Sequence, residues 1–125
     1  MSGAIVIAGT DTDVGKTLVS AGLMLCLPQA FYWKPVQAGT EPMTDTEAVQ
    51  ALTDLPEERF LPEAYRLATP ASPHLAARME DTVIAPSDLA LPQINAPLIV
   101  ESAGGVMVPL TDSSTSPDST PAAAA

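Results

Sequence analysis

The chain has few basic and few aromatic residues: 5 Lys and Arg stand against 15 Asp and Glu, and aromatic residues make up 4%. Its formal charge of −10 would repel nucleic acids and anionic membranes over most of the surface, so we expect neither as a partner. It has no apolar run of membrane-spanning length and no signal-peptide pattern, so we expect a cytoplasmic protein. A single cysteine, Cys26, excludes an intramolecular disulfide and is expected to be a small buried residue.

The chain has 125 residues, which is the length of one domain with its own core. Apolar runs and helix signals alternate along the chain, and this alternation predicts an α/β fold with a parallel sheet and flanking helices. The strands are expected at 4–8, 31–34 and 98–101, and the helices at 16–27, after 44, at 73–80 and, as a short one, around 87–91. A capping box, Thr44-x-x-Glu47, and an N-cap pair, Ser72-Pro73, mark the starts of two of these helices.

The last residues differ in composition from the rest. Beyond Asp112 the sequence consists of serine, threonine, proline, aspartate and alanine, and it offers nothing that buries a core. We therefore predict a folded domain at 1–112 and a disordered low-complexity tail at 113–125.

A run of glycine, threonine, aspartate and lysine at 9–17 follows the first predicted strand and opens the first predicted helix. This setting is typical of a phosphate-binding loop, in which backbone N–H groups and the positive end of the helix bind phosphate oxygens. Lys16 would add a mobile charge and the Thr17 hydroxyl a ligand for Mg²⁺. Because five residues separate Gly9 from Gly15, the loop is a deviant form. We expect the chain to bind ATP.

Two further clusters follow predicted strands. The segment 34–40 begins at Lys34, one of the two lysines of the chain, and the segment 101–110 begins at Glu101 and contains two consecutive glycines. Ligands gather at the carboxyl edge of an open parallel sheet. We therefore expect the phosphate-binding loop and these two segments to face one another.

These motifs together resemble the N-terminal half of dethiobiotin synthetases. That family carries a GTDTxVGKT loop, a KPVxxG segment, an SPH triplet and a VEGAGG stretch followed by a proline-leucine pair. The chain has corresponding residues in the same order at 9–17, 34–39, 72–74, 100–105 and 109–110. The match spans about residues 4–112, and since the family's enzyme continues well beyond the glycine segment, the chain is expected to be a truncated phosphate-loop NTPase-like domain. A sheet of three strands is expected to leave an unpaired edge.

The resemblance implies an ATP-dependent ligase of biotin synthesis. It carboxylates the diamine 7,8-diaminopelargonate with CO₂ and closes a cyclic urea through a phosphorylated carbamate, using ATP and Mg²⁺, and it forms a homodimer. By resemblance, Lys16 and Lys34 are the catalytic residues, and Lys34 and Ala38 contact the substrate. Thr17, Asp45 and Glu101 are the Mg²⁺ ligands. The residues implied for nucleotide binding are Thr12, Asp13, Val14, Gly15, Lys16, Thr17, Leu18, Asp45, Glu101, Ser102, Ala103 and Gly104.

Several alternatives stay open at this point. The alternative to a metal ligand at Asp45 is a first-turn acid favoured by the helix dipole, and the two explanations have equal weight. The alternative at Glu101 is a residue that simply caps a strand. A structural role is favoured for His74 and a core position for Trp33. Ala38 stands where the family commonly has a serine or threonine, so one hydroxyl contact to substrate is missing. The alternative functions are a non-catalytic nucleotide-binding remnant or regulatory module, and an ATPase of the positioning or partitioning type.

Overall fold

The computed structural model describes residues 3–8 and 13–103 of the chain. The strands are β1 (Gly3–Ile7), β2 (Phe31–Trp33), β3 (Val36–Ala38), β4 (Tyr65–Leu67) and β5 (Pro97–Glu101). The helices are α1 (Asp13–Cys26), α2 (Asp45–Thr53) and α3 (Pro73–Met79), together with two short 3₁₀ helices at Glu57–Arg59 and Pro86–Leu89. The predicted tail at 113–125 lies outside the described residues, and the division of the chain at residue 112 stays a prediction.

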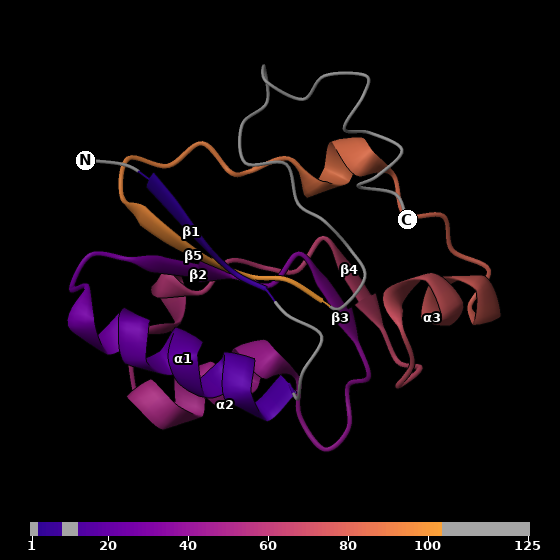
Figure 1. Ribbon diagram of the computed structural model, residues 1–125, viewed down its shortest axis with the longest axis horizontal. Coiled ribbons are helices and arrows are strands. Elements are labelled where there is room, and N and C mark those ends of the chain that lie inside the picture. The colour runs from indigo at the N-terminus through magenta and orange to yellow at the C-terminus, as the bar shows by residue number, and fades with distance from the viewer. Residues whose placement is uncertain (1–2, 9–12, 104–125) are drawn as a thin grey trace.

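The main sheet has three strands in the order β1-β5-β2, and both pairs are parallel (Figure 1). The last strand of the described chain therefore lies between the first two. Ile7 is opposite Glu101 on one side of β5, and Trp33 is opposite Val100 on the other. The predicted α/β class, a parallel sheet with flanking helices, is confirmed.

A second sheet consists of β3 and β4, which pair in parallel. Neither strand was predicted, because each has three residues, which is too few for a period-2 pattern, and neither is a run of aromatic residues like β2. Gly39 follows β3 and has a φ of 88°. A Cβ atom at this position would lie 3.2 Å from Pro70, so both the conformation and the close approach favour glycine. The KPVxxG segment thus enters the second sheet directly after Lys34.

The two long helices cover one face of the main sheet (Figure 1). Side chains alternate between the two faces along β5: Ile99 lies in the cluster beneath α1 and α2, while Leu98 and Val100 pack on the opposite face with Trp33. The cluster under the helices consists of Ala21, Met24, Ala30, Tyr32, Val49, Phe60 and Ile99. Glu101 has the same parity as Ile99 and so lies on the helix-covered face.

Cys26 is exposed, so the expectation of a buried cysteine is wrong. It is the last residue of α1 and follows the fully buried Met24 by two positions, which places it about 200° around the helix. Trp33, in contrast, is buried as expected, and its indole Nε1 donates to the carbonyl oxygen of Pro62 at 3.0 Å.

Both predicted helix starts are confirmed. The Thr44 hydroxyl accepts from the Glu47 backbone N–H at 3.1 Å, and the Glu47 carboxylate accepts from the Thr44 backbone N–H at 2.8 Å. Ser72 caps α3, and Pro73 occupies its first turn. α1 begins at Asp13, three residues before the predicted start. The helix therefore opens inside the phosphate-loop motif.

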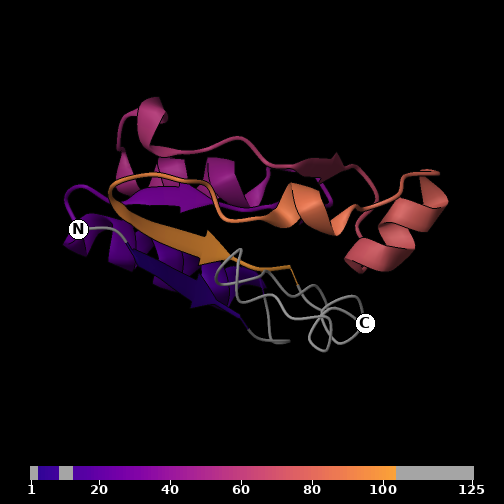
Figure 2. The ribbon, with the colours of Figure 1, turned by 90° about the horizontal axis from the view of Figure 1, so that it is seen from above.

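The two edges of the main sheet differ. The outer side of β2 is joined by the segment after the first 3₁₀ helix, where the Leu61 backbone N–H donates to the Tyr32 carbonyl oxygen at 2.8 Å. β1 has no second partner among residues 3–8 and 13–103, and its residues Gly3 to Ile5 are exposed (Figure 2). Within the part of the chain that the structure describes, the edge without a partner is β1. No described helix is long and apolar enough to cross a membrane.

Candidate nucleotide and metal site

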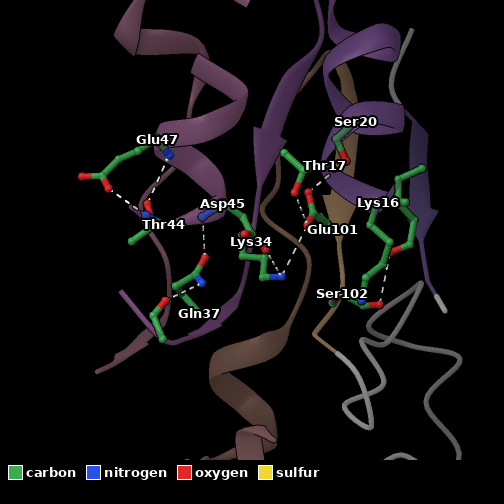
Figure 3. Close-up of polar contacts among 12 residues, drawn as sticks. Lys16, Thr17, Ser20, Lys34, Gln37, Thr44, Asp45, Glu47, Glu101 and Ser102 are labelled. Carbon is green, nitrogen blue, oxygen red and sulfur yellow. Dashed lines mark hydrogen bonds and ion pairs between the residues drawn. The ribbon is translucent and has the colours of Figure 1, made fainter. Parts of the chain in front are cut away.

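Polar side chains from α1, β2, α2 and β5 meet at the carboxyl edge of the main sheet (Figure 3). The structure brings together residues from all three segments that the sequence predicted to face one another. They are Lys16, Thr17, Lys34, Asp45, Glu101 and Ser102. Parallel strands present their carboxyl ends to one edge, which explains how residues 84 and 86 positions apart in sequence come into contact.

Glu101 is the centre of this cluster. Its side chain is fully buried, and its two carboxylate oxygens have different partners. Oε1 accepts hydrogen bonds from the Tyr32 hydroxyl at 2.9 Å and the Ser20 hydroxyl at 3.1 Å. Oε2 lies 3.3 Å from the Thr17 hydroxyl and 3.5 Å from Lys34 Nζ. These contacts compensate the burial of a carboxylate, which would otherwise be very costly.

Lys34 lies between two carboxylates. Its Nζ is 2.6 Å from Asp45 Oδ2 and 3.5 Å from Glu101 Oε2, and its side chain is 3% exposed. The lysine follows β2 with the same parity as Tyr32, so both point to the face covered by α1 and α2. A buried ammonium is tolerated here because two carboxylates accept hydrogen bonds from it.

Lys16 and Thr17 occupy the first turns of α1, and both are buried. Lys16 Nζ donates to the backbone carbonyl oxygen of Ser102 at 3.2 Å. Ser102 in turn donates its backbone N–H to the Ile7 carbonyl oxygen at 3.0 Å. The lysine of the phosphate loop is thereby tied to the segment that follows β5.

Asp45 is the first residue of α2 and is held by its backbone as well as by its side chain. Its N–H donates to Gln37 Oε1 at 2.9 Å, and Gln37 Nε2 donates to the Gly39 carbonyl oxygen at 2.9 Å. The Thr44 capping box fixes the residue before it. Asp45 is thus a first-turn acid of α2 and also a partner of Lys34, and its role as a Mg²⁺ ligand stays a prediction.

Burial governs the ionisation of the two acidic groups that share a hydrogen bond. Burial raises the pKa of the Glu101 carboxyl above its usual range, and the charge of Lys34 acts against that rise. Burial also raises the pKa of the Tyr32 hydroxyl, and the negative charge of Glu101 raises it further. Tyr32 therefore keeps its proton and acts as a donor to Glu101.

The oxygen atoms of the cluster fit one kind of metal site. Among the described residues there is no group of three or more His, Cys, Asp or Glu side chains that could hold a metal ion. Mg²⁺ commonly takes one or two carboxylates and completes its coordination with water and nucleotide phosphates. Thr17, Asp45 and Glu101 present a hydroxyl and two carboxylates beside Lys34 Nζ, so the donor set fits Mg²⁺ bound together with a nucleotide.

The remaining sequence-predicted positions are more scattered. The backbone of Asp13 and Val14 begins α1, Gly15 follows, and Leu18 is 55% exposed on the same helix. Ala103 is buried after β5. Thr12 and Gly104 lie outside the described residues.

Ala38 ends β3 and packs against the cluster that contains Val36, Leu67 and Ala76. It lies four residues after Lys34 and on the second sheet. His74 is exposed on α3.

Three residues of the cluster were not predicted from the sequence: Ser20, Tyr32 and Gln37. Ser20 lies one helical turn after Thr17, so the helical period places both on one side of the helix. Tyr32 lies two residues before Lys34, so the strand period places both on one side of the extended chain. These two spacings were the signals for Ser20 and Tyr32. Gln37 offered no such signal, because its contact with Asp45 depends on the course of the segment 39–44. All three hydrogen-bond to a residue predicted to bind metal.

Comparison with known proteins places these observations in context. A family model described as "AAA domain" matches residues 3–120. The chain is similar to an ATP-dependent dethiobiotin synthetase of Rhodopseudomonas palustris strain HaA2, with 59% identity over 111 residues that cover 89% of this chain and 52% of the relative. It is similar to an enzyme of the same name from Rhizorhabdus wittichii, with 56% identity over 110 residues, 88% of this chain and 52% of the relative.

A third relative of that name, from Nitrobacter hamburgensis, is 55% identical over 111 residues that cover 89% of this chain and 52% of the relative. The resemblance to the N-terminal half of dethiobiotin synthetases is thus confirmed. The chain spans about half the length of the curated relatives it matches.

Proposed function

The chain belongs to the AAA domain family, and we propose that it provides the nucleotide- and metal-binding part of an ATP-dependent dethiobiotin synthetase. The observation that carries the proposal is the buried contact of Lys34 with both Asp45 and Glu101, beside Thr17 at the start of α1. A lysine between two carboxylates next to a phosphate loop provides charges of both signs where a metal and a transferring phosphoryl group must be stabilised.

The proposed substrates are 7,8-diaminopelargonate, CO₂ and ATP. One amine of the diamine captures CO₂ as a carbamate, the carbamate oxygen attacks the γ-phosphorus of ATP, and ADP leaves. The neighbouring amine then attacks the carbamate carbon and phosphate leaves, which closes the cyclic urea. None of these steps needs a protein nucleophile, since phosphoryl transfer depends mainly on positioning and charge stabilisation.

In this proposal Lys16 binds the phosphate oxygens, and Lys34 stabilises the carbamate and the transferring phosphoryl group. Both side chains are buried, where a charge acts more strongly than in water. Ala38, four residues after Lys34 in the KPVxxG segment, is proposed to line the substrate site without a hydroxyl contact.

Thr17, Asp45 and Glu101 are the proposed ligands of Mg²⁺. The metal would neutralise charge on the β- and γ-phosphates when bound. The homodimer of the full-length enzyme and a location in the cytoplasm belong to the same proposal.

The test is a chimera that replaces the matched 111 residues of the Rhodopseudomonas palustris strain HaA2 relative by those of this chain. We expect it to form dethiobiotin from the diamine, bicarbonate and ATP, measured by mass spectrometry with phosphate release followed in parallel. Lys34→Gln in the chimera should reduce diamine-dependent phosphate release at least a hundredfold, because a buried charge at the reacting group is lost. ATP affinity should fall much less.

Arg66→Gln is the matched control, because Arg66 is a cation that is 52% exposed and pairs weakly with Glu47 at 3.9 Å. It should leave turnover unchanged. Phosphate release at the same rate with and without the diamine would instead support a positioning or partitioning ATPase. Tight ATP binding by the chimera without any turnover would support a nucleotide-binding module.

A further inference from the structure

The two oxygens of the Glu101 carboxylate are held by different residues. Oε1 receives hydrogen bonds from Tyr32 at 2.9 Å and Ser20 at 3.1 Å. A carboxylate oxygen has about two lone-pair positions, and these two donors fill them. Oε1 is therefore occupied by the protein itself.

Oε2 faces the site instead. Its neighbours are the Thr17 hydroxyl at 3.3 Å and Lys34 Nζ at 3.5 Å, which are longer contacts than those at Oε1. The Thr17 hydroxyl and Lys34 both belong to the proposed nucleotide and metal site. Oε2 is thus the carboxylate oxygen directed to a cation that shares Thr17.

The donors at Oε1 come from two rigid elements. Tyr32 lies on β2, which pairs with β5 directly beside Glu101, and its ring is fully buried in the core under α1. Ser20, also fully buried, lies on α1 one turn after Thr17. Among the residues that the structure describes, the Tyr32 and Ser20 hydroxyls each donate to Glu101.

We propose that Tyr32 and Ser20 are positioning residues that fix the Glu101 carboxylate through Oε1, so that Oε2 is presented to Mg²⁺. This inference rests on the proposed nucleotide and metal site and adds two residues that the motifs of the sequence do not contain. Partners of metal-ligating carboxylates commonly change metal affinity by about 10–100-fold when they are removed. The Tyr32 hydroxyl, the shorter of the two contacts, makes the larger contribution.

The experiment compares Tyr32→Phe with the parent chain of 125 residues. Mn²⁺ serves as the probe, and its dissociation constant in the presence of ATP is measured by electron paramagnetic resonance. ATP affinity without metal is measured by isothermal titration calorimetry. We expect Tyr32→Phe to weaken Mn²⁺ binding by about tenfold, while metal-free ATP affinity stays within about twofold, since the aromatic ring and the core packing are retained.

Tyr65→Phe is the matched control, because it removes a hydroxyl whose contacts are the Asp88 carboxylate and the Ala85 backbone N–H, neither of which belongs to the Glu101 cluster. It should not change Mn²⁺ binding. Ser20→Ala provides the second variant and decides the question by the same readout if Tyr32→Phe fails to fold.

The outcomes separate the two proposals. If the parent binds Mn²⁺ with ATP and both Tyr32→Phe and Ser20→Ala bind it equally well, the positioning role is wrong and the metal site stands. If the parent itself binds no Mn²⁺ in the presence of ATP, the metal site of the proposed function is wrong, and the positioning role with it. A loss of metal-free ATP affinity equal to the loss of Mn²⁺ affinity would overturn the positioning role, because it indicates general disruption.

Discussion

Lys34 balances two acidic side chains at once, and this double contact makes it the most sensitive residue of the site. Removing one partner of a buried ion pair typically costs about 3–5 kcal/mol, because the other charge is left uncompensated. Here two carboxylates, Asp45 and the fully buried Glu101, would lose their cation. A neutral residue at this position therefore affects the stability of the apo site as well as its chemistry.

Lys16→Ala is expected to weaken the binding of ATP with Mg²⁺ by roughly tenfold to a hundredfold, because hydrogen bonds to charged groups contribute about 1.5–3 kcal/mol. Lys16 also donates to the Ser102 carbonyl oxygen, a charge-assisted hydrogen bond that the substitution removes as well. Isothermal titration calorimetry measures the affinity. Arg78→Ala, which removes an exposed cation of α3, should leave it unchanged, and equal affinities for Lys16→Ala and the parent would exclude the phosphate-loop assignment.

The residues of the site that the sequence predicted are those whose chemistry is visible in a local pattern. Lys16 and Thr17 belong to the loop motif, and Glu101 is a lone acid at the end of an apolar run. Tyr32 was not recognised, because an aromatic residue in a buried strand looks like a core residue. Its spacing from Lys34 indicated the side on which it lies, but the contact of its hydroxyl with Glu101 depends on the pairing of β2 with β5, which no local pattern contains.

At the scale of elements, the start of α2 is sensitive to pH. The Thr44 backbone N–H donates to the Glu47 carboxylate, and this bond lowers the pKa of that carboxyl below its usual range. A carboxyl with a lowered folded-state pKa contributes stability above its unfolded-state pKa of about 4.3 and loses it as the pH falls through the folded value.

We therefore expect Glu47→Gln to lower the melting temperature at pH 7, where Glu47 is ionised, and to have little effect at pH 3. Thermal unfolding followed by circular dichroism at the two pH values measures the difference. Glu58→Gln, in the 3₁₀ helix Glu57–Arg59, is the control for a general charge effect. A deficit of the same size at both pH values would show that the charge of Glu47 does not stabilise the helix start.

The elements differ in how far the sequence predicts them. α2 and α3 have explicit start signals, Thr44-x-x-Glu47 and Ser72-Pro73, and both begin at the predicted residue. β3 and β4 have none, and they form because their backbones meet: the Gly39 N–H donates to the Leu67 carbonyl oxygen at 2.8 Å and the Tyr65 N–H to the Pro35 carbonyl oxygen at 3.0 Å. Such non-local pairings are not encoded in either segment alone.

At the scale of the whole molecule, β1 is an edge strand among the described strands, and a second chain can pair on such an edge. Ile5 is 41% exposed on this strand, and we expect the chain to self-associate there. Ile5→Lys should reduce the association, because a charged side chain on an edge strand opposes pairing with another chain. Sedimentation velocity measures the distribution of species.

Val83→Lys is the matched control, since Val83 is 85% exposed outside both sheets and the substitution changes charge and apolar surface in the same way. It should leave the association unchanged. An equal reduction by both variants would mean that net charge, not the edge of β1, governs self-association.

The central place of β5 also fixes the order in which a growing polypeptide can acquire its structure. β1 and β2 each pair with β5 and not with each other, so the main sheet cannot form before residues 97–101 have left the ribosome. Until then β1 and β2 have no strand to pair with, and nascent chains in this state are prone to aggregate. Glu101 arrives with the same strand, so the proposed metal ligand and the pairing of β1 and β2 with β5 appear in a single step of biosynthesis.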